Sequence, residues 1–126
     1  MAGKALQLFP DPLITKQSMA ASFNGTPTNI QVYDNVGIQL SWSGADPLGT
    51  INVQVSLDYD PRFPSGGVWT LLQDPSGNAI KIQPTGSAGN GYFDLNQLSA
   101  PWIQVVYTTA SSSSGLLTSK IIAKAV

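Results

Sequence analysis

The chain contains no cysteine, no histidine and no glutamate. Without cysteine it has no disulfide, no zinc–thiolate site, no iron–sulfur cluster and no thiol nucleophile. Without histidine it lacks the commonest general base and transition-metal ligand, and with them the Ser-His-Asp machinery. Charge is also scarce, since 10% of the 126 residues are charged and the net charge is −1. We therefore expect a protein that acts by contact, is not an enzyme, and needs no catalytic residue, cofactor or metal.

Several partner classes are disfavoured in the same way. The six basic residues are scattered singly, so no basic patch for nucleic acid is expected. No apolar run approaches the roughly 18 residues that a membrane-spanning helix needs. The first residues, MAGKALQLFPDP, lack the apolar core of a secretory signal. We expect no nucleic-acid partner, no membrane partner and no signal peptide.

Strand signals dominate what is present. Residues 38–42 and 51–59 alternate apolar and polar side chains, and turn-forming stretches follow at 43–49 and 60–67. Further candidate strands cover 18–23, 28–32, 68–73, 79–83, 102–108 and 116–126. About seven to nine short strands at such spacings are typical of a β-sandwich or a small barrel. The fold class predicted is all-β, a single antiparallel β-sandwich of jelly-roll or immunoglobulin-like topology.

The alternation also predicts which side chains face the core, because a one-residue slip would reverse every side chain in a strand. The expected inner positions are Ile38, Leu40, Trp42, Ile51, Val53, Val55 and Leu57. The expected outer positions are Gln39, Ser41, Asn52, Gln54 and Ser56.

The N-terminal residues differ in character from the rest. Pro10 and Pro12 cannot sit in a central strand, so residues 1–17 are predicted to form an extended arm and residues 18–126 the sandwich. Exposed apolar side chains on such an arm would mark an interaction site. The candidate subunit contacts are Leu6, Leu8, Phe9, Leu13 and Ile14. The alternative is an edge strand folded on its own sandwich.

Two groups of residues are candidate functional sites. Asp58 and Asp60 would share one face of a strand, where a pair of carboxylates could bind calcium or act in a glycosidase. The preferred interpretation is that both aspartates are solvated residues at the end of a strand, before the turn at Pro61. Tyr59 and Phe63 lie near a loop rich in glycine and proline and are the best candidates for an exposed ligand platform. Such a platform would indicate a carbohydrate-binding module.

Three segments carry a resemblance to a known group of proteins. They are LGTINVQVS at 48–56, VWTL at 68–71 and LNQLSAPWIQVVY at 95–107. Together they resemble small structural proteins encoded by tailed bacteriophages, over residues 37–126. The resemblance implies a non-enzymatic virion protein, synthesised in the host cytoplasm, that contacts other capsid or tail subunits and forms a homo-oligomer in the particle.

The expected function is therefore structural: a bacteriophage virion protein of the capsid decoration or cement type. A fold poor in charge agrees with this, because it can contact other proteins without a large cost for removing charges from water. The alternative is a carbohydrate- or host-receptor-binding module on a spike, fibre or tail.

Overall fold

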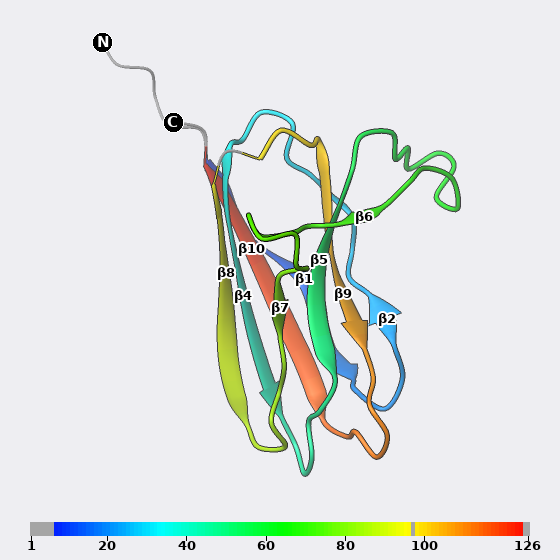
Figure 1. The fold of residues 1–126 in the computed structure, drawn as a ribbon, viewed down its shortest axis with the longest axis vertical. Helices are drawn as coiled ribbons and strands as arrows, with labels where there is room; N and C mark the ends of the chain where they lie inside the picture. Colours follow the sequence, from blue (N-terminus) through cyan, green and yellow to red (C-terminus); the bar gives the residue numbers. More distant parts are fainter. Residues whose placement is uncertain (1–6, 97, 125–126) are drawn as a thin grey trace.

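The computed structural model describes residues 7–96 and 98–124, and within these ranges every regular element is a strand, so none is a helix that could cross a membrane. One sheet contains, in order, β1 (Gln7–Ser18), β10 (Leu116–Lys124), β4 (Asn35–Ser43) and β8 (Gly89–Asn96). The other contains β2 (Phe23–Asn24), β9 (Trp102–Thr108), β5 (Thr50–Ser56) and β6 (Thr70–Leu71), with β3 (Thr28–Asn29) on β9 and β7 (Lys81–Ile82) on β5. The two sheets pack face to face (Figure 1), which confirms the predicted antiparallel sandwich.

The strand order identifies the topology. Both β2 and β3 pair with β9, and both β6 and β7 pair with β5, so each couple behaves as one interrupted strand. Counted in this way, the first sheet holds the first, eighth, third and sixth strands, and the second sheet holds the second, seventh, fourth and fifth. This is the order of a jelly roll, a double sheet built from two Greek keys. The structure therefore decides between the two topologies that the sequence left open.

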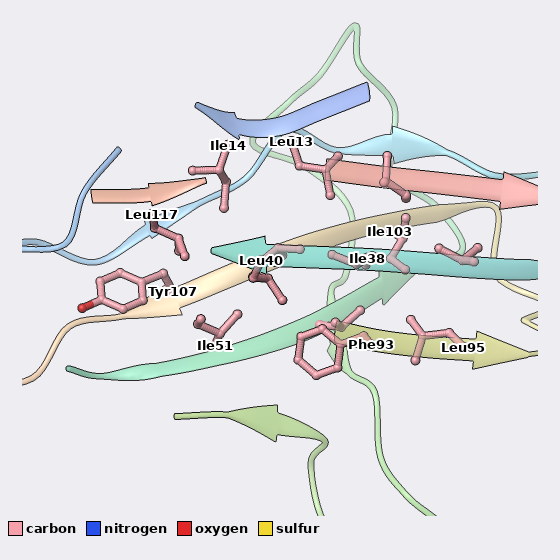
Figure 2. Close-up of a cluster of buried hydrophobic side chains, with 14 of the residues drawn as sticks. Leu13, Ile14, Ile38, Leu40, Ile51, Phe93, Leu95, Ile103, Tyr107 and Leu117 are labelled. Carbon is pink, nitrogen blue, oxygen red and sulfur yellow. The ribbon is translucent and has the colours of Figure 1, made fainter. Parts of the chain in front are cut away.

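The predicted alternation holds along β4. Ile38 and Leu40 have no exposed surface, whereas Gln39 and Ser41 between them face the solvent. Period-two alternation of this kind presents one apolar face, which must be buried against the other sheet. Figure 2 shows the side chains of Ile38 and Leu40 facing those of Ile51, Ile103 and Tyr107 from the opposite sheet.

The prediction fails at the end of β5. Ile51 and Val53 are fully buried as expected, but Leu57 is 78% exposed and Ser56 is buried. The strand ends at Ser56, whose Oγ accepts hydrogen bonds from the N–H groups of Asp58 (3.3 Å) and Tyr59 (3.1 Å). This local turn ends the pleat, so Leu57 no longer follows the inward phase of the strand.

Two amides on the outer side of β5 are half-buried and paired. The Asn52 side chain donates to the Ile80 carbonyl oxygen (2.9 Å), and Gln104 on the neighbouring strand donates to Gln54 Oε1 (2.7 Å). Because each amide has a partner, its partial burial leaves no large penalty.

The N-terminal segment is part of the sandwich over the described residues. β1 pairs with β10 along its length, and Leu13 and Ile14 are buried in the core (Figure 2). Residues 7–17 therefore belong to an edge strand, which was the alternative to the predicted arm. The two prolines are tolerated because an edge strand needs backbone donors on one side only, and the pairing shifts register between Leu8 and Asp11 and again after Pro12. Residues 1–6, including Leu6, lie outside the described residues.

Two glycines allow β4 and β10 to approach where their pairing begins. Gly44 and Gly115 have φ angles of 118° and 126°, in the left-handed region that favours glycine. A Cβ on Gly44 would lie 2.5 Å from Gly115 Cα, and one on Gly115 would lie 2.3 Å from the Ser43 carbonyl oxygen. Any larger residue at either position would push the strands apart.

The Tyr107 hydroxyl joins three connections at one end of the sandwich. The side chain is fully buried, and its oxygen lies 3.0 Å from the Met19 carbonyl oxygen and 2.9 Å from Ser113 Oγ. The same hydroxyl contacts the carbonyl oxygen of Leu48. Met19 follows β1, Leu48 precedes β5 and Ser113 lies between β9 and β10. One polar group thus ties together segments that are distant in sequence.

Replacing Tyr107 by Phe removes this buried hydroxyl and leaves carbonyl groups with fewer donors. We expect the free energy of unfolding to fall by about 1–3 kcal/mol, measured by chemical denaturation. Tyr92→Phe is the control, because Tyr92 is 58% exposed, and we expect it to change stability by no more than about 0.5 kcal/mol. Equal losses in the two variants would contradict the assigned role of Tyr107.

Candidate interaction surface at the loop after β5

The loop of residues 57–69 between β5 and β6 concentrates exposed apolar side chains. It projects from the upper right of the molecule in Figure 1. Leu57, Phe63 and Val68 are 78%, 67% and 68% exposed, and Leu71 in the adjoining β6 is also exposed. We call these four side chains the apolar tip. Burying such side chains is favourable, so an exposed group of them indicates a contact surface.

Asp58 holds the two ends of the loop together. Its Oδ1 accepts hydrogen bonds from the Val68 N–H (2.8 Å) and from Ser56 Oγ (3.1 Å). The Val68 N–H, followed by the Ser56 hydroxyl, lowers the pKa of the Asp58 carboxyl below its ordinary value. The carboxylate thereby sets the positions of Leu57 and Val68 on either side of it.

Asp60, in the same loop, binds a different partner from that of Asp58. Its carboxylate binds the Arg62 guanidinium through both oxygens, with a closest N···O distance of 2.8 Å, and also accepts the Arg62 N–H (2.9 Å). The Arg62 side chain, followed by its backbone N–H, lowers the pKa of Asp60. The two aspartates thus face different partners, and among the described residues no cluster of three acidic side chains that could hold a metal ion is found.

An aromatic cluster supports the base of the loop. The Tyr59 ring lies 5.3 Å from the Trp69 ring and 4.9 Å from the Trp102 ring, in tilted and edge-to-face geometry. All three rings are half-buried. Such aromatic pairs add to the free energy of burial, so the cluster fixes the loop against the start of β9.

The structure separates the two residues of the predicted ligand platform. Tyr59 packs into the aromatic cluster, whereas Phe63 stands exposed at the tip with the Arg62 guanidinium 5.8 Å from its ring centroid. A cation at that distance interacts with the face of the ring. Tyr59 therefore supports the loop, and Phe63 is the aromatic side chain that the loop presents to a partner.

An open hollow of about 480 Å³ lies beside the apolar tip. It is lined by residues of the loop, of the adjoining strands β5 and β6, and of the segment before β9: Val55, Ser56, Leu57, Asp58, Val68, Thr70, Ser99 and Ala100. Most of the exposed lining surface is apolar, although four of the eight lining residues are polar, and the carboxylate of Asp58 is already hydrogen-bonded. This arrangement can accept an apolar side chain from another molecule.

The sequence identified the loop but not all the side chains that it exposes. Phe63 was predicted as exposed, whereas Leu57 was expected to face the core and Val68 was included in a strand. The candidate contacts Leu13 and Ile14 are buried in the core of the sandwich, while the side chains of Leu8 and Phe9 lie outside the described part of the structure. The sequence signal for the exposure of Leu57 is Ser56 followed by Asp58, because this pair of residues is typical of a turn that ends a strand.

Comparison with known proteins identifies a similar fold. No protein-family model matches the sequence, and no curated protein sequence matches it significantly. Among solved structures, the chain is similar to the crystal structure of the SPBc2 prophage-derived protein YomS, with a TM-score of 0.62. The alignment covers 99% of this chain and 98% of that chain at 12% sequence identity. At this identity the likeness establishes the fold that the two proteins share.

The hydrogen bond from Val68 to Asp58 predicts a pH-dependent loop. Because the folded pKa of Asp58 is lowered, its contribution to loop stability is present above the ordinary value of 3.8 and is lost as pH falls through the lower folded value. The chemical shift of the Val68 N–H should follow this titration in NMR spectra, with a midpoint below 3.8.

Asp58→Ala should abolish that titration, whereas Asp60→Ala should preserve it because Asp60 binds Arg62 instead. A Val68 signal that titrates unchanged in the Asp58→Ala variant would refute the assigned contact.

Proposed function

We propose that this protein is a non-enzymatic structural component of a bacteriophage virion, of the capsid decoration or cement type. In this role it binds neighbouring capsid or tail subunits through the apolar tip. The observation that carries the proposal is the exposure of Leu57, Phe63 and Val68 on one anchored loop beside an apolar hollow.

The anchoring of the loop supports a role in binding, because an anchored loop presents its exposed side chains in fixed positions. Asp58 bridges the loop ends and Tyr59 packs between Trp69 and Trp102, so the exposed side chains are held in place before any partner arrives. A surface that is already ordered loses less conformational entropy on association. Low charge supports the same role, because few ions must be stripped of water when the surface is covered.

The fold supports a phage origin by analogy. The similar chain is described as a prophage-derived protein, and the jelly roll recurs in viral capsid domains. One fold serves many functions, so this analogy is secondary to the surface itself. In the proposed setting the chain is synthesised in the host cytoplasm and incorporated into the particle.

A second function, carbohydrate or host-receptor binding, rests on the exposed ring of Phe63 and on the use of the jelly roll in lectins. The ring is less suited to sugar stacking than an open platform, because the Arg62 guanidinium lies over it. Tyr59 is engaged in its own cluster. Protein docking is therefore the preferred function.

The test uses particles of a phage that encodes this chain. Particles depleted of the protein are mixed with purified protein, and binding is measured by co-sedimentation and electron microscopy. We expect the double substitution Leu57→Ser and Val68→Ser to weaken binding by at least roughly 100-fold, since each apolar side chain contributes about 1.5–3 kcal/mol when buried.

Val32→Ser is the matched control, because Val32 is 59% exposed and lies outside the loop. It should bind particles like the unmodified chain. Failure of the unmodified protein to bind, or equal losses in both variants, would reject docking through the apolar tip. Binding to host-cell polysaccharide in place of particles would establish the second function.

A further inference from the structure

The β8 strand presents a long, regular and unpaired edge. It lies at the end of its sheet, and its pairing with β4 runs in unbroken register from Asn35↔Asn96 to Trp42↔Gly89. Within the described part of the chain, no strand pairs with its other side. The free side of a strand carries N–H and C=O groups that another strand can bind.

The other sheet edges are less suited than β8 to pairing with a strand of another chain. β1 contains Pro10 and Pro12 and has three irregularities in its register, and Lys16 within it has a positive φ of 45°. At the edges of the other sheet, β2, β3, β6 and β7 have two residues each. Prolines, bulges and short strands are the usual protections of a sheet edge. β8 has none of them, since it is eight residues long and contains no proline or lysine.

Side chains leave the β8 edge accessible. Tyr92 is 58% exposed, but its hydroxyl end lies over Gly37 on β4, where the missing Cβ makes room. The ring therefore points across the sheet and away from the free edge. On the inner side, Phe93, Ile80 and Ile82 line an open hollow of about 680 Å³, and the Ile82 side chain lies over Gly91.

We propose that the occupant of this edge is β8 of a second copy of the chain. Antiparallel pairing about a twofold axis at Tyr92 uses the whole strand and keeps the inner faces of both copies on the same side. Asn90 then lies opposite Asp94 of the second copy, so an amide donor meets a carboxylate twice. Gly91 lies opposite the bulky Phe93 of the second copy. The edge is thus complementary to itself.

The pairing also closes the open side of the sandwich. The hollow between β8 and residues 74–82 has a mixed lining, apolar at Ala79, Ile80, Ile82, Tyr92 and Phe93 and polar at Asp74, Asn78 and Lys81. In the symmetric pair, the hollow of one copy faces that of the other, so half-buried apolar side chains become covered. The result is a continuous sheet of two four-stranded halves, and it forms in solution independently of any virion.

The first test is a cysteine crosslink, which is clean because the chain has no cysteine of its own. Directly opposite residues of antiparallel strands have Cα atoms about 4.5–5.5 Å apart, within the range of a disulfide. Tyr92→Cys should therefore form a covalent dimer under mild oxidation. Gln39→Cys is the matched control, because Gln39 pairs with Tyr92 on the same outer face but lies one strand inward. Its two copies would be three strand spacings apart, roughly 14 Å, and should not crosslink.

The second test uses charge and leaves the backbone intact. Asn90→Asp places two carboxylates opposite each other twice per dimer, and we expect it to weaken the dimer roughly tenfold in sedimentation velocity. Combining Asn90→Asp with Asp94→Lys restores opposite charges and should restore dimerisation. Melting temperatures of the variants report whether each one is folded.

Three results would overturn the proposal: an unmodified chain that stays monomeric at roughly millimolar concentration, equal crosslinking of the Tyr92→Cys and Gln39→Cys variants, or a dimer that is indifferent to Asn90→Asp. Each is independent of the apolar tip, so failure here leaves particle binding to be judged by its own experiment.

Discussion

The packing of the two inner sheet faces against each other is the interaction on which the rest of the molecule depends. Ile38, Leu40 and Ile51 are fully buried between the sheets (Figure 2). Val53 is fully buried as well, and each of the four side chains contributes about 1.5–3 kcal/mol relative to an exposed position. With few charges and no disulfide, the chain has no other large source of stability. The requirement to cover these faces also draws β1 into the sandwich, because Leu13 and Ile14 complete the apolar layer beside β10.

Polar contacts refine this packing at the two ends of the sandwich. At one end, Tyr107 collects the connections around Met19, Leu48 and Ser113 through a single hydroxyl. At the end of β5, Ser56 and Asp58 end the strand and clamp the following loop. The first contact closes the core, whereas the second turns apolar side chains outward. The same kind of local hydrogen bond thus serves stability in one place and presentation of a surface in the other.

The two proposed contact surfaces differ in chemistry and in reach. The apolar tip offers side chains that any complementary hollow can bury, and this suits a partner of different sequence. The β8 edge offers backbone groups and a side-chain pattern that matches itself, and this suits a second copy. A molecule with both surfaces can pair with itself and still bind another protein, and repeated weak contacts of this kind gain strength on a symmetric particle.

The sequence by itself determined four of the six long strands, β4, β5, β9 and β10, and most of the inner faces of β4 and β5, but it did not determine β1 or β8. Alternation at 38–42 and 51–55 is local information, because side chains two residues apart share a face whatever the strand pairs with. The order of the strands was decided only by the tertiary structure, since a jelly roll and an immunoglobulin-like sandwich differ in which strands pair and not in their patterns. The same holds for the N-terminal segment, where two prolines argued against a strand until an edge position beside β10 made them acceptable. Leu57 and Val68 became a surface for a similar reason: their exposure depends on where Asp58 anchors the loop, a contact between residues ten positions apart that no periodicity encodes.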